Sequence, residues 1–82
     1  PKNAPALNNL GNLDFFTKDY AQAITYYIQA TDADPQDPDY LMNLLKANLH
    51  LKYWDAAKKI GAQAVLLDPD LAPAVQALTE NR

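Results

Sequence analysis

The sequence predicts an all-α protein built as a helical repeat. Prolines recur at a spacing of 34 residues at Pro1, Pro35 and Pro69, and apolar residues recur at spacings of three and four within each interval. Spacings of three and four place side chains on one face of an α-helix. A fixed period of this length is typical of solenoids, in which small helical units stack on one another. The period extends to other pairs of identical residues, which include Leu7 with Leu41, Asn9 with Asn43, Lys18 with Lys52, Ala23 with Ala57, Ala30 with Ala64 and Asp34 with Asp68.

Two helices are expected in the first period, over about 4–17 and 20–33. Pro35 and Pro38 then stop the helical pattern, because proline lacks an amide donor and clashes with the preceding turn. The apolar positions that predict the two helices are Leu7, Leu10, Leu13, Tyr20, Ala23, Ile24, Tyr27 and Ala30.

The second period repeats this arrangement, with helices expected over about 38–51 and 54–67. Asp37 followed by Pro38 is typical of an N-cap and the first residue of a helix. A shorter helix is expected over about 72–80, after Pro69. The apolar positions of the second period are Leu41, Leu44, Leu45, Leu51, Trp54, Ala57, Ile60, Ala64 and Leu67.

The composition indicates one small folded domain and excludes several functions. The 82 residues are 49% hydrophobic, and seven basic against ten acidic side chains give a net charge of −3. This charge argues against nucleic-acid and anionic-membrane partners, which need clustered lysine and arginine. No apolar run approaches the roughly 18 residues of a membrane span. With no cysteine, the sequence has no thiol nucleophile or disulfide, and it does not favour any compartment.

The motif residues resemble a known family. Leu10-Gly11, Ala23, Tyr27 and Pro35 resemble the tetratricopeptide repeat, whose signature is W-x2-L-G-x2-Y, then A-x3-F, then P. The resemblance implies a first repeat over 4–37, a second over 38–71, and a capping helix or partial third repeat over 72–82. It also implies a right-handed superhelix of antiparallel helix pairs. Residues 1–3 would fall in the last turn of a preceding repeat, so the chain is expected to be part of a longer array.

The sequence departs from this signature at several positions. Leu7 and Leu41 replace the tryptophan, and Asp14 and Asn48 replace the tyrosine. In the second unit, Leu45 stands in place of the small glycine and Gly61 in place of the large aromatic residue. The two lie equally far from a turn near residue 53, so we expect Leu45 to face Gly61 and to fill the volume that the glycine leaves.

The resemblance places the candidate binding site on the first helix of each unit, because the first helices of this family line a concave groove that takes extended peptides. Asparagine suits such a ligand, since its amide both donates and accepts hydrogen bonds. The candidate groove residues are Asn8, Asn9, Asn12, Phe16, Met42, Asn43, Lys46, Leu49, His50 and Gln76, with Glu80 after them.

Some family members grip the C-terminal carboxylate of chaperones with lysine, asparagine and arginine side chains, and this site is not expected here. Asn12 and Asn43 match the two asparagines of that clamp, but Asn8, Pro73 and Ala77 stand where its cations would be. Without cations, the charge-assisted hydrogen bonds that give a clamp its strength are missing.

Catalysis and metal binding are not expected either, and no cofactor is implied. His50 is the only histidine and lacks the partners that a metal site or a general base requires. Asp32, Asp34, Asp37 and Asp39 lack the spacing of a calcium loop, and helix capping explains them better.

The sequence therefore predicts a protein-interaction scaffold that is not an enzyme. One hypothesis is a groove that binds an extended peptide. The alternative is a structural array that self-associates through its exposed ends or positions a neighbouring domain. Tyr20, Tyr27 and Trp54 are expected in the core, and Lys58 and Lys59 on a solvated face.

Overall fold

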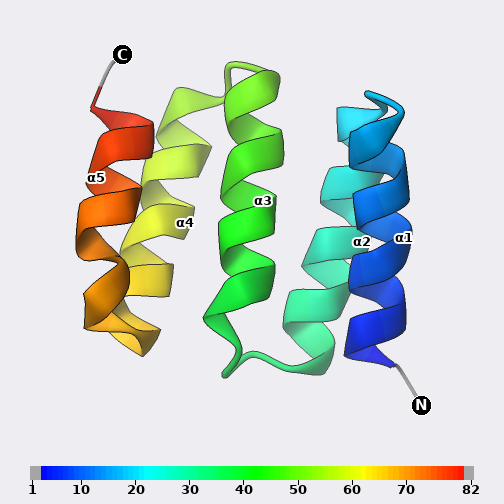
Figure 1. Ribbon diagram of the computed structural model, residues 1–82, viewed down its shortest axis with the longest axis horizontal. Coiled ribbons are helices and arrows are strands. Elements are labelled where there is room, and N and C mark those ends of the chain that lie inside the picture. Colours follow the sequence, from blue (N-terminus) through cyan, green and yellow to red (C-terminus); the bar gives the residue numbers. More distant parts are fainter. Residues whose placement is uncertain (1–2, 81–82) are drawn as a thin grey trace.

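The computed structural model describes residues 3–80, so Pro1 and the end of the 72–82 element lie outside the described residues. Consecutive helices run in opposite directions, with α1, α3 and α5 in one layer and α2 and α4 in the layer behind them (Figure 1). This arrangement is all-α, as the sequence predicts. The elements are α1 (Ala4–Phe16), α2 (Tyr20–Ala33), α3 (Pro38–His50), α4 (Trp54–Leu67), the 3-10 helix η1 (Pro69–Leu71) and α5 (Ala72–Thr79).

The helix boundaries lie within one residue of the expected ones, and side-chain caps fix the starts of α1, α2 and α3. Asp37 is the N-cap of α3, and its side chain accepts a hydrogen bond from the backbone N–H of Asp39 at 2.9 Å. Asp19 caps α2 in the same way, through the backbone N–H of Gln22. The sequence did not predict η1, a single turn that begins at Pro69 after the N-cap Asp68. None of the helices within residues 3–80 has the length and apolar character needed to cross a bilayer.

The two first helices end in the same hydrogen-bonded motif, 34 residues apart. After α1, the N–H of Lys18 donates to the carbonyl of Phe15, and the N–H of Asp19 donates to that of Asp14. This pattern is a Schellman motif, which requires a left-handed residue at the position of Lys18. Lys18 has φ 68° and its counterpart Lys52 has φ 64°, so a lysine occupies each position where glycine is usual.

The core lies between the two layers and contains side chains of both units. Tyr27 and Leu45 are the largest fully buried side chains among the described residues. The buried set also includes Ala23, Leu41, Leu44, Ala47, Ala57 and Ala64. The prediction for the aromatic residues holds for Tyr27 but is wrong for Trp54, which is 36% exposed. Trp54 is the first residue of α4, so it lies at the end of the helix pair, where fewer neighbours surround it.

Each glycine lies where a neighbouring helix approaches closely. A β-carbon on Gly11 would lie 2.6 Å from a ring carbon of Tyr27. A β-carbon on Gly61 would lie 3.1 Å from Leu45 Cδ1, which confirms that these two positions face each other. It would also lie 2.5 Å from Val75 Cγ1, so α5 fills part of the volume that the sequence assigned to Leu45 alone. Gly61 therefore allows both α3 and α5 to pack against α4.

Candidate functional site

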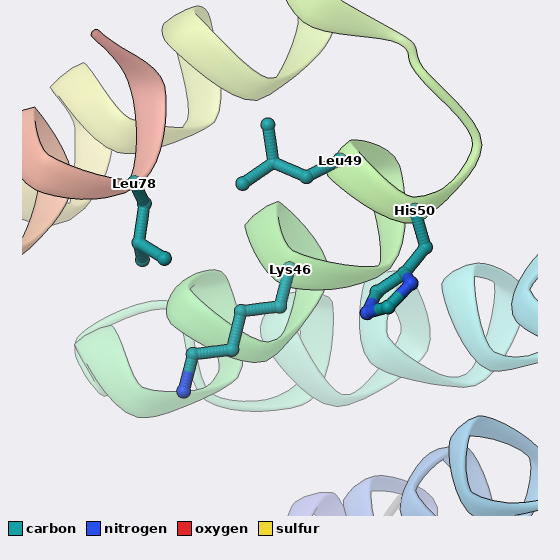
Figure 2. Close-up of a pocket in the computed structure, with 4 residues that line it drawn as sticks. All are labelled: Lys46, Leu49, His50 and Leu78. Atoms are coloured by element: carbon teal, nitrogen blue, oxygen red, sulfur yellow. The ribbon is translucent and has the colours of Figure 1, made fainter. Parts of the chain in front are cut away.

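A pocket of about 280 Å³ lies between α3 and α5, in the layer of first helices (Figure 2). Lys46, Leu49 and His50 line it from α3, and Leu78 lines it from α5. Positions 46, 49 and 50 share one face of α3, because residues three and four apart are neighbours on a helix. The pocket therefore combines two apolar side chains with an ammonium group and an imidazole.

Lys46 provides the positive charge of this pocket. Lys46 is exposed, and Figure 2 shows its side chain extending along the surface of α3. Within the part of the chain that the structure describes, no ion pair or hydrogen bond engages its ammonium group. The ammonium group is thus free to pair with an acidic group of a ligand that enters the pocket.

Two aromatic side chains hold the His50 imidazole in place. The ring of His50 stacks on that of Tyr20, with centroids 4.4 Å apart and planes 9° apart. Phe15 packs its ring edge-on to both, at 5.1 Å from each. These contacts link the last turn of α3 to α1 and α2, and they fix the ring at the rim of the pocket. His50 is exposed, as expected.

The asparagines of the first helices form hydrogen bonds within the protein. Asn43 Nδ2 donates to Asn8 Oδ1 at 2.9 Å, which joins α3 to α1. The Tyr27 hydroxyl donates to Asn12 Oδ1 at 2.7 Å, which joins α2 to α1. Burial, and secondarily the charge of Asp14, raises the pKa of Tyr27, so the hydroxyl stays protonated and donates. Each bond uses only part of an amide, and N–H groups remain on both Asn12 and Asn43.

The remaining predicted site residues have different environments. Asn9, Phe16 and Gln76 are exposed, and Phe16 has 85% of its surface accessible. Met42 is a correction to the prediction: it is buried and packs in the core with Leu41 and Tyr27. Its position on α3 faces the helix pair instead of the open surface, a distinction that helical spacing alone did not make.

The sequence analysis missed Leu78 as a pocket residue. Leu78 stands 34 residues after Leu44, which is buried in the core. Its position in the period therefore indicated a core residue, and no sequence signal placed it at a pocket. Leu78 is partly buried against the core and also lines the pocket.

Within residues 3–80, no three histidine, cysteine or carboxylate side chains come close enough to hold a metal ion. Comparison with known families gives the class of protein: a tetratricopeptide repeat model matches residues 17–81. The chain belongs to the tetratricopeptide repeat family. Domains of this family are typically non-catalytic and bind proteins.

A solved tetratricopeptide repeat structure is similar to this chain over nearly its whole length. It is the first tetratricopeptide repeat domain of Spaghetti (RPAP3), bound to the HSP90 peptide SRMEEVD. The similarity has a TM-score of 0.83 and 27% sequence identity, and it covers 95% of this chain and 67% of the other. A search of curated proteins finds no match to this chain.

Proposed function

We propose that this chain is a non-catalytic tetratricopeptide repeat module that binds an extended, acidic peptide segment across α1, α3 and α5. The observation that carries the proposal is the pocket formed by Lys46, Leu49, His50 and Leu78. It offers a cation beside an apolar surface, a combination that suits a carboxylate next to an apolar side chain. Asn12 and Asn43 supply amide N–H groups that suit a peptide backbone.

The similar Spaghetti (RPAP3) domain supports this ligand class, because its peptide SRMEEVD combines three acidic residues with methionine and valine. The manner of recognition proposed here is different from a terminal clamp. Asn8, Pro73 and Ala77 provide no cations for a terminal carboxylate, and Asn8 already accepts a hydrogen bond from Asn43. An acidic side chain within the segment, paired with Lys46, is therefore the proposed anchor.

Fluorescence anisotropy with labelled SRMEEVD as the probe tests the proposal. We expect Lys46→Glu to weaken binding by about tenfold, since an attraction becomes a repulsion at the pocket. Lys58→Glu is the matched control, because it makes the same charge change at an exposed position of α4. Equal affinities of the two variants would contradict the site.

A second pair of probes tests which carboxylate the pocket binds. We expect amidation of the peptide's C-terminus to change its affinity less than replacement of its two glutamates by glutamine. The physical reason is the lack of cations at positions 8, 73 and 77. A larger loss on amidation would show that the terminal carboxylate is the anchor, against the proposal.

The alternative function, a structural array that self-associates, has one specific observation in its favour. Leu10 and Leu13 are exposed on α1, on the side away from α3. A pull-down of the purified chain on a Lys46→Glu bait separates the two functions. Self-association through α1 should survive this substitution, because it does not involve the pocket.

A further inference from the structure

A second pocket, of about 320 Å³, lies in the other layer of the molecule, and the proposed function does not use it. It opens between α2 and α4, and these two helices run in the same direction behind α3 (Figure 1). It shares no residue with the first pocket. Its lining residues are Thr31 of α2, Pro35 of the following loop, Leu41 of α3, and Gln63, Leu66 and Leu67 of α4.

The lining of this pocket is mostly apolar, with Thr31 and Gln63 as its polar members, and it includes a leucine that is largely exposed to water. Leu66 has 83% of its surface exposed, and Leu67 has 36% exposed. Both belong to the last turn of α4. Burying a leucine side chain in a partner is favourable, because it removes apolar surface from water. The pocket volume lies near the lower end of the range for ligand sites, about 300 to 1,000 Å³.

The charges beside the pocket are negative. Asp32 follows Thr31, Asp34 precedes Pro35, and Asp68 follows Leu67. The C-terminal ends of α2 and α4 lie at the same end of the molecule, and neither has a basic residue in its last turn (Figure 1). The partial negative charge of each helix C-terminus therefore adds to that of the aspartates. The nearest lysine along α4 is Lys59, one turn before Gln63 and so further from this end.

The pKa of Tyr40 is also affected by nearby aspartates, one of which is Asp34. Burial raises its pKa above the ordinary value, and the charges of Asp37, Asp34 and Asp39 raise it further. Three aspartates at or just before the start of α3 thus act together on the hydroxyl of Tyr40. The α3 N-terminus, whose dipole is positive, is already offset by Asp37 as the N-cap and Asp39 in the first turn.

We infer that the pocket between α2 and α4 binds a basic amphipathic helix of a partner protein. A leucine-like side chain of that helix enters beside Leu66 and Leu67, and its lysines or arginines face Asp32, Asp34 and Asp68. Apolar contact gives the affinity, and the charges give the orientation and the on-rate. The molecule then has two binding surfaces with opposite charge preferences. The surface on α3 and α5 binds an acidic segment of a ligand, and the surface on α2 and α4 binds a basic one.

A synthetic peptide of leucine and lysine only, ordered so that the leucines share one helical face, is the probe. We expect Leu66→Glu to weaken its binding at least about tenfold. The substitution adds a negative charge, so charge attraction alone would predict tighter binding of the basic peptide. Apolar contact at Leu66 predicts weaker binding, and the measured direction of the change distinguishes the two explanations. Tyr53→Glu is the matched control, since Tyr53 is 54% exposed at the opposite end of α4 and its substitution should leave the affinity unchanged.

Three further measurements complete the test. In NMR spectra, the probe should shift the signals of Thr31, Gln63, Leu66 and Leu67, and an alanine–lysine peptide of equal charge should not. Binding to Leu66→Glu as tight as to the parent chain overturns the inference. The inference is also overturned if sedimentation velocity shows a dimer of the parent chain that Leu66→Glu dissociates. The pocket would then be occupied by a second copy of this chain. Lys46→Glu should leave this binding intact, so failure of the first site and failure of the second are distinguishable.

Discussion

Three helices meet at Gly61, because this residue of α4 has no side chain and both α3 and α5 pack against it. The space over its α-carbon is occupied by Val75 Cγ1 of α5 and Leu45 Cδ1 of α3. In the first unit the arrangement is reversed, since Gly11 lies on the first helix and the ring of Tyr27 occupies the space. Close packing requires a small residue opposite each large one, and the two units satisfy this requirement in opposite directions.

We expect Gly61→Ala to lower the free energy of unfolding in the parent chain and to raise it in a Val75→Ala background. In the parent chain the added methyl group overpacks against Val75, which costs typically about 1 to 3 kcal/mol and exceeds the gain in helix propensity. Without the valine methyl groups, the gain of roughly 1 kcal/mol of alanine over glycine remains. Urea denaturation of the four chains measures the coupling. The same effect of Gly61→Ala in both backgrounds would show that Val75 does not restrict the site.

At the scale of elements, the repeat is visible in the backbone as well as in the side chains. Lys18 and Lys52 hold left-handed conformations after α1 and α3, and the hydrogen bonds around them are the same. A left-handed conformation costs an L-residue roughly 1 to 2 kcal/mol. The fold tolerates this cost because the Schellman motif satisfies two carbonyl groups at each helix end.

Lys52→Gly should therefore stabilise the protein, by about 0.5 to 1 kcal/mol. Removing the left-handed strain outweighs the extra chain entropy that glycine loses on folding. Lys58→Gly is the matched control, because Lys58 is also exposed but lies within α4, where glycine costs about 1 kcal/mol. Thermal denaturation of the two variants should give shifts of opposite sign. A loss of stability in Lys52→Gly would mean that the lysine side chain stabilises the turn.

The whole molecule is a thin, two-layered body, with principal extents of 34 × 26 × 16 Å. Such a shape leaves much apolar surface outside the core, and Leu10, Leu13, Phe16 and Leu66 are all exposed. Repeat units bury their apolar faces against neighbouring units, so an end unit keeps one face open. Leu10 and Leu13 leave such an open apolar face on α1 in the described residues.

We expect the melting temperature to rise with protein concentration, because association at this end stabilises the folded chain by mass action. Replacing both Leu10 and Leu13 by serine should remove the dependence. Differential scanning calorimetry over a wide concentration range, with sedimentation equilibrium, measures both effects. A monomer at every concentration with a constant melting temperature would contradict the expected association.

The sequence by itself determined the five α-helices of this protein, but not the short turn η1. Proline positions, N-cap aspartates and apolar spacing act over a few residues, so they located five helices to within one residue. The 34-residue period then predicted the opposition of Leu45 and Gly61, because two helices joined by a short turn must lie antiparallel. The family resemblance placed the candidate groove on the first helix of each unit. Of those candidate residues, Lys46, Leu49 and His50 line one pocket in the structure.

Tertiary structure decided how each helix face is covered. Met42 is buried and Trp54 is 36% exposed because of neighbours that are distant in sequence, and the spacing of apolar residues does not encode those neighbours. The position of α5 is the clearest example. By packing on α4 it brings Val75 over Gly61 and Leu78 to the pocket. Contacts between elements depend on the shapes of both surfaces, and only the folded chain brings those surfaces together.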